Sequence, residues 1–214
     1  MDQDIEIINT ETRIEKIKNF FKKNLKKIAT ILLTFIFIII GIFSFQINEK
    51  NKKKEIAEKY NSSILQFNQG EKTSVILSMK EIINTKDKTY SPLALYFLID
   101  SQISLPKQEI NKYFDIIIYE IKLDEEIKNL NIFKKAMYNS EFQNEEEMLK
   151  IINPLINSDS IWKSHALYLM GEYFYYKKEK QKSIEFFNKI LEIKNVNPSI
   201  KLEAQRRLQR DLSE

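Results

Sequence analysis

Residues 28–47 decide the architecture: they read IATILLTFIFIIIGIFSFQI and contain no charged residue. At ~1.5 Å of rise per residue this run makes a helix of ~30 Å, which matches the hydrocarbon core of a bilayer. Helices buried in soluble proteins rarely stay uncharged on every face over such a length. The sequence therefore predicts one transmembrane helix.

A cleaved signal peptide is the main alternative for this run. Its apolar part is longer than the usual ~7–15 residues, a long segment precedes it, and Ser44-Phe45-Gln46-Ile47 offers no small-x-small cleavage site. We therefore expect a permanent anchor.

The orientation of the anchor follows from the basic residues on its two sides. Seven precede it (Arg13, Lys16, Lys18, Lys22, Lys23, Lys26 and Lys27) and five follow it (Lys50, Lys52, Lys53, Lys54 and Lys59). The excess predicts a cytoplasmic amino terminus. Residues 48–214 would then lie in the periplasm of a Gram-negative cell, with the anchor in the inner membrane.

Residues 1–27 form a basic amphipathic segment before the anchor. Ile14, Ile17, Phe21 and Leu25 are spaced by three, four and four residues, as on one face of a helix. An apolar stripe among lysines suits a helix on an anionic membrane surface, a helix that docks a partner, or a solvated lead-in to the span.

Composition excludes several function classes. The chain has no Cys and one His, so thiolate and multi-histidine metal centres are excluded, and we expect no metal. Its three glycines are too far apart for a phosphate-binding loop, and no cofactor motif is present. His165 has no Ser or Cys nucleophile motif to act on, so we expect no enzyme. A net charge of +4 from 34 basic and 30 acidic residues does not indicate nucleic-acid binding.

Beyond residue 48 the apolar residues recur at helical spacing and strand alternation is missing. The prolines, N-cap candidates such as Asp124, Asn144 and Ser158 or Asp159, and the expected stops at Gly70 and Asn153-Pro154 divide this part into helices. The predicted ranges are 49–68, 72–85, 91–104, 106–121, 124–139, 144–153, 159–177, 180–194 and 198–212. The fold class is all-α: one transmembrane helix, followed by four helical hairpins and a terminal helix that carries Arg206, Arg207 and Arg210 on a solvated face.

The hairpins repeat at about 34 residues, which is the tetratricopeptide period. Residues 165–198, HALYLMGEYFYYKKEKQKSIEFFNKILEIKNVNP, resemble that repeat in residues as well as period. Gly171 and Ser183 stand where two helices would approach closely. The residues expected to pack between them are Leu167, Met170, Phe174, Phe187 and Ile190. Together these patterns favour a tetratricopeptide-like α-solenoid.

The first helix of this hairpin also has a polar face. His165, Tyr168, Glu172 and Tyr175 are spaced by three, four and three residues, and the repeat geometry would turn them into the concave groove. Tyrosines beside an acid and a histidine suit the binding of a peptide, and these four residues are the candidate partner-binding groove. The alternative is that the tyrosines pack against the neighbouring hairpin.

The layout resembles the bacterial inner-membrane family of YfgM type, the ancillary subunits of the Sec translocon. The resemblance is carried by the basic amino-terminal helix with its anchor and by residues 158–191, SDSIWKSHALYLMGEYFYYKKEKQKSIEFFNKIL, with Ala166-Leu167 and Gly171 at the family's positions. It implies a noncatalytic protein that joins the translocon and assists exported polypeptides, together with a periplasmic chaperone.

Two functions therefore compete. The first is a membrane-anchored protein-interaction module whose partners are translocon subunits, a periplasmic chaperone or exported polypeptides. The second is an envelope scaffold for cell division or envelope assembly, which acts by forming homo-oligomers.

Overall fold

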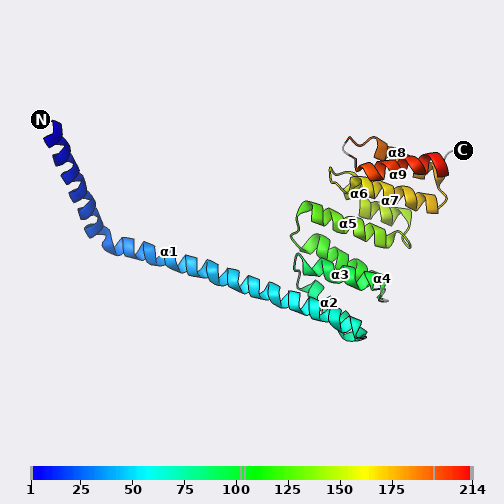
Figure 1. Ribbon diagram of the computed structural model, residues 1–214, viewed down its shortest axis with the longest axis horizontal. Coiled ribbons are helices and arrows are strands. Elements are labelled where there is room, and N and C mark those ends of the chain that lie inside the picture. The colour runs from blue at the N-terminus through cyan, green and yellow to red at the C-terminus, as the bar shows by residue number, and fades with distance from the viewer. Residues whose placement is uncertain (1, 102, 104, 195, 213–214) are drawn as a thin grey trace. The chain divides into compact units, whose positions relative to one another are not determined.

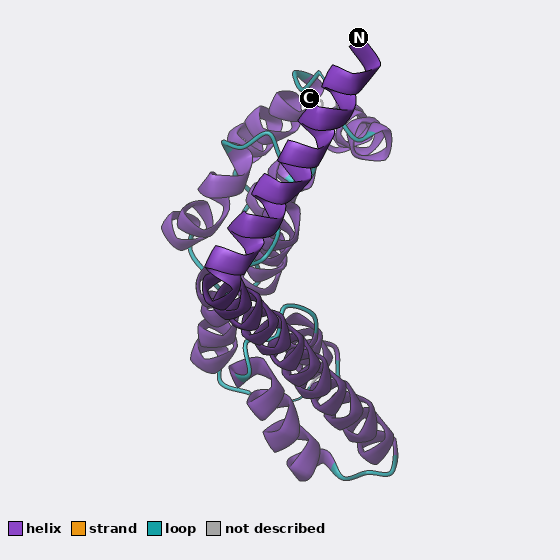
Figure 2. Cartoon of the chain, turned by 90° about the vertical axis from the view of Figure 1, so that its left-hand side faces the viewer, coloured by secondary structure: helices purple, strands orange, loops and turns teal. Residues whose placement is uncertain are grey.

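A computed structural model describes the backbone of residues 2–101, 103, 105–194 and 196–212, and within these ranges the side chains from residue 13 onward except that of residue 28. This part of the chain is helical and contains no strand (Figure 2). It divides into two compact units, residues 1–55 and 56–214, which are described separately.

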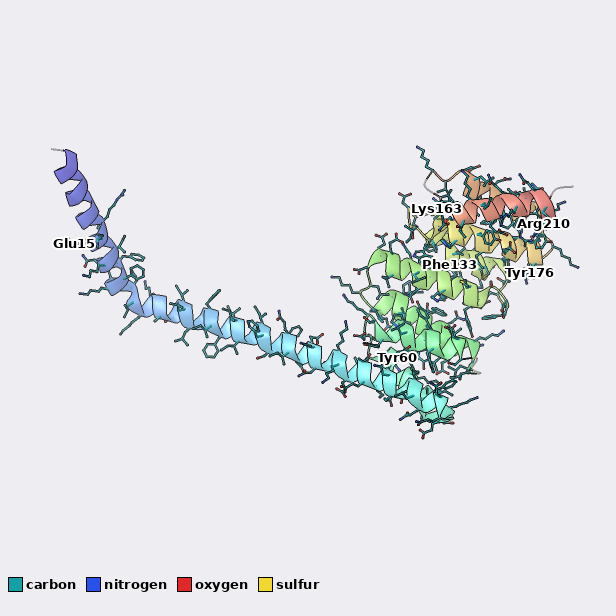
Figure 3. All side chains as sticks on the ribbon, viewed as in Figure 1. Glu15, Tyr60, Phe133, Lys163, Tyr176 and Arg210 are labelled. Atoms are coloured by element: carbon teal, nitrogen blue, oxygen red, sulfur yellow. The ribbon has the colours of Figure 1, made fainter. Side chains whose placement is uncertain are left out.

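The first unit belongs to one helix, α1 (Asp2–Asn68), which is drawn in dark to light blue in Figure 1 and continues into the second unit. The expected helices at 28–47 and 49–68 are therefore parts of a single helix, because no Pro or Gly interrupts residues 42–68. Residues 29–68 are long and apolar enough at their amino-terminal end to cross a membrane. Figure 3 shows the side chains of this region projecting around the helix.

The second unit begins with the end of α1 and continues through shorter helices (Figure 1). They are α2 (Lys72–Asn84), α3 (Tyr90–Asp100), α4 (Lys107–Asp115), η1 (Ile116–Glu120), α5 (Glu125–Asn139), α6 (Glu145–Ile156), α7 (Lys163–Tyr176), α8 (Lys180–Leu191), α9 (Pro198–Arg206) and η2 (Arg207–Asp211). The elements η1 and η2 are π-helical turns that continue α4 and α9. The helix predicted over 91–104 ends earlier than expected, because α3 ends at Asp100 and residues 101 and 103 are not helical; residue 104 itself lies outside the described residues.

Local sequence explains most helix ends. The side chain of Asn144 accepts a hydrogen bond from the Glu147 N–H at 3.0 Å and so caps α6. Asn197 caps α9, whose first residue is Pro198. Gly70 has a φ of +95° in the turn after α1, a conformation that glycine adopts at no steric cost.

Two predicted boundaries are wrong. The stop at Asn153-Pro154 does not occur, because α6 runs through Pro154 to Ile156 and buries Leu155 completely. The start at 159 is also wrong: Ser158 and Ser160 form a hydrogen-bonded turn, and α7 begins at Lys163. In both places packing of the following residues outweighs the local signal.

The core of this unit is one continuous cluster that runs between the helices. On α8, for example, Ser183, Phe187 and Ile190 are buried and lie on one face, spaced by four and three residues. The closest pairs of helices are α7 with α8, α2 with α3, and α5 with α6. Helices α2 and α3 belong to different predicted hairpins, yet α3 packs more extensively against α2 than against α4, its expected partner.

Contacts also join every second helix. Rings pair α1 with α3 (Phe67 with Phe97) and α5 with α7 (Phe133 with His165), while the Tyr96 hydroxyl of α3 donates to the Asn131 amide oxygen of α5. Ion pairs join α2 with α4 and α6 with α8 (Lys80–Glu109 and Lys182–Glu145). The odd-numbered helices therefore contact one another. The even-numbered helices do so in two places, α2 with α4 and α6 with α8.

Candidate functional site

The predicted close approach in the last hairpin takes place between α7 and α8. A Cβ added to Gly171 would lie 2.7 Å from the nearest atom of the Phe187 ring. The Ser183 hydroxyl donates to the Gly171 carbonyl at 2.8 Å, and both residues are buried. The predicted packing residues are likewise buried: Leu167, Met170, Phe174, Phe187 and Ile190.

The four residues of the candidate groove lie on α7, and each has a neighbour within the second unit. The His165 ring lies 5.8 Å from the Phe133 ring and 5.2 Å from the Trp162 ring. Its Nδ1 atom is buried, and no hydrogen-bond partner for it is found among the described residues. The Tyr168 ring packs edge-on against Phe187 at 5.3 Å.

Arg207 of η2 covers the other half of this stripe. Its guanidinium donates two hydrogen bonds to the Glu172 carboxylate, at 2.6 and 2.5 Å, and lies 4.3 Å from the centre of the Tyr175 ring. Arg207 also pairs with Asp211, and its side chain is only 13% exposed. The expectation that this arginine lies on a solvated face is therefore wrong, whereas Arg206 and Arg210 are exposed.

These contacts change the acidity of the groups around Arg207. Burial, and then the neighbouring Glu172, raise the pKa of Tyr168 to about 12. Hydrogen bonds from Arg210 and Arg207 lower the pKa of Asp211 to about 2. The carboxy-terminal end of α7 is thus held to η2 by a charged cluster that is ionised at neutral pH.

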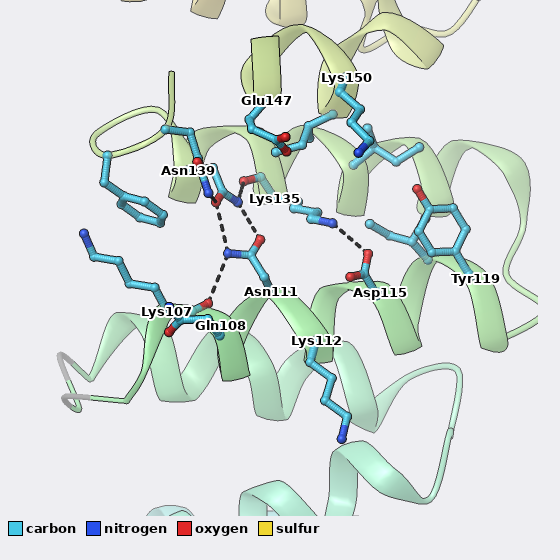
Figure 4. Close-up of a pocket in the computed structure, with 15 residues that line it drawn as sticks. Lys107, Gln108, Asn111, Lys112, Asp115, Tyr119, Lys135, Asn139, Glu147 and Lys150 are labelled. Atoms are coloured by element: carbon cyan, nitrogen blue, oxygen red, sulfur yellow. Dashed lines mark hydrogen bonds and ion pairs between the residues drawn. The ribbon is translucent and has the colours of Figure 1, made fainter. Parts of the chain in front are cut away.

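A polar cleft of about 780 Å³ opens between α4 and its continuation η1 on one side and α5 and α6 on the other (Figure 4). This cleft was not predicted from the sequence. Four lysines and two carboxylates line it: Lys107, Lys112, Lys135, Lys150, Asp115 and Glu147. No short motif marks these residues, because they come from three separate helices.

The floor of this cleft carries a pair of amides. Asn111 and Asn139 exchange hydrogen bonds of 3.0 and 2.8 Å, and Asn139 is fully buried. Beside them, Lys135 pairs with Asp115 at 2.7 Å. The amide N–H groups of Asn111 and Asn139 are all donated within the protein, so this cleft offers a ligand mainly the ammonium groups of its lysines.

An aromatic cleft of about 560 Å³ lies between α3, α4 and α5. Its lining includes Tyr96, Phe114, Tyr138, Phe142 and the exposed Met137. The Lys134 ammonium lies 4.2 Å from the centre of the Tyr96 ring, and Lys107 lies 3.7 Å from that of Phe142. Burial raises the pKa of Tyr96, whose hydroxyl bonds to Asn131. Asp100 and Glu141 also line the cleft, and apolar area framed by charges of both signs is a surface that suits a polypeptide.

The described residues contain no group of three or more His, Cys, Asp or Glu side chains placed to hold a metal ion. Comparison with protein-family models, with curated proteins and with solved structures finds no match to this chain.

Proposed function

We propose that this protein is a membrane-anchored, noncatalytic protein-interaction module. The observation that carries the proposal is the exposure of the apolar part of α1. The large apolar side chains from Ile31 to Ile47 are each between 37% and 69% exposed. Each Å² of such surface costs roughly 25 cal/mol in water, so a run of this length needs a lipid environment.

Two hydroxyl groups in the first part of this stretch bond within the helix. The Thr30 hydroxyl donates to the Lys26 carbonyl and the Thr34 hydroxyl donates to the Thr30 carbonyl, both at 2.9 Å. In a bilayer core there is no water to bond such groups, so internal hydrogen bonds are required. These bonds support the assignment of residues 28–47 as the anchor.

We also propose that the second unit is a tetratricopeptide-like solenoid. Contacts between every second helix and the close approach of Gly171 to Phe187 both favour it. In such a solenoid the odd-numbered helices form one surface.

That surface is the proposed protein-binding face. Every odd-numbered helix of the second unit exposes at least one large apolar side chain: Leu65, Leu93, Ile127, Met137, Tyr175, Tyr176 and Leu202. The aromatic cleft beside Met137 belongs to the same face. Apolar side chains that recur from helix to helix suit a polypeptide partner.

The partner proposed first is the Sec translocon with its exported polypeptides, with the carboxy-terminal unit outside the cytoplasm. This rests on the resemblance to the YfgM-type family and on the excess of basic residues before the anchor. The alternative remains an envelope scaffold that binds copies of itself.

The first test is topology. A reporter active only outside the cytoplasm and one active only inside are fused, separately, to the carboxyl end of the full chain. We expect activity of the outside reporter. Activity of the inside reporter alone would contradict the translocon proposal and leave a cytoplasmic adaptor at the membrane.

The second test is photocrosslinking in cells. A photoreactive residue replaces Met137, on the proposed binding face, or Leu77 of α2, which is also exposed but lies on an even-numbered helix. We expect adducts with translocon subunits or exported chains from position 137 and fewer from position 77. Homodimer adducts alone would favour the scaffold, and equal labelling from both positions would contradict the assigned face.

A further inference from the structure

Residues 13–27 of α1 present an apolar face that nothing in the described chain covers. Ile14, Ile17, Phe20, Phe21 and Leu25 are all more than half exposed. With ~100° of rotation per residue they occupy an arc of about 140° on the helix. Asn24 lies beside Phe20 on this face, and its amide donates to the Phe20 carbonyl at 3.0 Å, so the amide is satisfied within the helix.

The opposite face is basic. Lys16, Lys22, Lys23 and Lys26 fall on the far side of the helix, while Lys18 and Lys27 flank the apolar arc and Arg13, the first residue of the segment, lies within it. Glu15 is the acidic residue among positions 13–27. A helix with a narrow apolar face, a lysine-rich face and low overall hydrophobicity lies in the plane of a membrane surface.

We propose that residues 13–27 form an interfacial helix whose apolar face inserts among anionic lipid headgroups. The proposal rests on the proposed anchor, because α1 continues from Lys27 into the apolar stretch and so holds the end of this segment at the bilayer surface. It also requires a bend, because a straight helix would carry residues 13–27 away from the bilayer, and Figure 1 shows α1 bending between its dark-blue amino-terminal part and the lighter part that follows. Lying along the surface brings the lysines within a Debye length of the lipid charges, which is about 10 Å at 0.1 M salt. Lys18 and Lys27, beside the inserted face, reach the lipid phosphates, while Lys23 faces water.

A lipid occupant is favoured over a protein because the positive charge of the segment and its position beside the proposed anchor both fit an anionic membrane surface. An anionic surface attracts the lysines from the side to which the anchor already brings the helix. An experiment can separate the two occupants. Contact with lipid should occur when the protein is reconstituted into vesicles alone, whereas contact with a partner protein would require that protein to be added.

The absence of cysteine from the chain makes a direct test simple. Three single-cysteine variants of the full chain are made, Phe21→Cys on the apolar face, Lys23→Cys on the basic face as the matched control, and Ile36→Cys in the anchor. Each carries an environment-sensitive fluorophore. The proteins are reconstituted into vesicles of neutral lipid or of neutral lipid with about a third of anionic lipid.

We expect the label at position 21 to shift to the blue and to lose its quenching by an aqueous quencher in anionic vesicles. The label at 23 should remain quenched, and the label at 36 should be protected in both kinds of vesicle. Raising NaCl to 1 M, where the Debye length is about 3 Å, should restore much of the quenching at 21 and leave 36 unchanged. Diluting the protein in the membrane should leave position 21 protected.

The two proposals fail in different ways. Equal quenching at positions 21 and 23 with position 36 protected would overturn the interfacial helix and leave the anchor intact. Quenching at position 36 would overturn the anchor itself. Protection at position 21 that is lost on dilution would show contact between copies of the chain and would also overturn the lipid proposal.

Discussion

Gly171 is the residue where the packing of the last hairpin leaves least room. The Phe187 ring occupies the space that a side chain at position 171 would need, and this ring is itself fully buried. Alanine is preferred over glycine in a helix by about 1 kcal/mol, but overpacking a core costs typically 1–3 kcal/mol. The steric term should therefore prevail.

We expect Gly171→Ala to lower the free energy of unfolding of the second unit by up to about 2 kcal/mol. The measurement is urea unfolding followed by far-UV circular dichroism, on the chain in detergent. Gly41→Ala is the matched control, because nothing lies within 4 Å of a Cβ at that position. An unchanged midpoint for Gly171→Ala would show that the ring moves aside.

Because the pKa of Tyr168 is raised, we expect the stability of this hairpin to fall at alkaline pH. Its pKa is raised to about 12, so the folded chain holds the phenol proton more tightly than the unfolded chain does, with its ordinary value near 10. The resulting stabilisation is complete below about pH 10 and is lost as the pH rises through about 12. A thermal melting series from pH 8 to 12 should show this loss, and Tyr168→Phe should reduce it, unlike Tyr176→Phe at an exposed ring.

Single residues were predicted from sequence only where one hairpin determines their surroundings. Gly171 and Ser183 follow from a local pattern, because α7 and α8 are neighbours in the chain. The position of Arg207 against Glu172 could not be read in this way, since it depends on how η2 folds back on α7. The cleft around Asn111 and Asn139 has the same origin, since its lining comes from three helices.

At the scale of elements, α9 with η2 is held to α7 by one charged cluster. The bidentate pair between Arg207 and Glu172 is mostly sheltered from solvent, and hydrogen bonds to charged groups contribute about 1.5–3 kcal/mol. The nearby pair between Arg206 and Glu203 is much more exposed, and such pairs contribute about 0–1 kcal/mol.

We therefore expect Glu172→Gln to release the terminal helix, and Glu203→Gln to leave it in place. Hydrogen exchange followed by mass spectrometry should show faster exchange in residues 198–211 for the first variant only. Equal exchange in both variants would mean that apolar contacts, such as those of the buried Ala204 and Leu212, hold this helix without the ion pair.

Helix ranges were predicted well because caps and prolines act locally, as Asn144 and Asn197 show. The errors occur where burial competes with a local signal. Leu155 has a place in the core, so α6 continues past Pro154 although proline disfavours a helix interior. The pairing of α2 with α3 was missed because the period alone does not fix where a hairpin starts.

At the scale of the whole molecule, the boundary between the two units falls after Glu55. The buried core of the described residues lies within 56–214, whereas the large apolar side chains described in the first unit, from residue 14 onward, are exposed. We expect a protein made of residues 56–214 to be soluble without detergent and to keep the helical circular dichroism spectrum of this unit. The full chain should precipitate when detergent is removed. Aggregation of the shorter protein would show that the first unit also supports the fold.

The alternation of contacts between helices has a consequence for how the chain is made. The side-chain bonds that join α3 to α5, α6 to α8 and α7 to η2 span 35, 37 and 35 residues. Contacts of such short reach form quickly, and a nascent chain grows by about 5–20 residues per second. Each helix can thus find its neighbours within seconds of emerging from the ribosome or from a membrane pore. Most of the domain can assemble in order from its amino-terminal end, and only the contact of Arg207 with Glu172 has to wait until the last residues have been made.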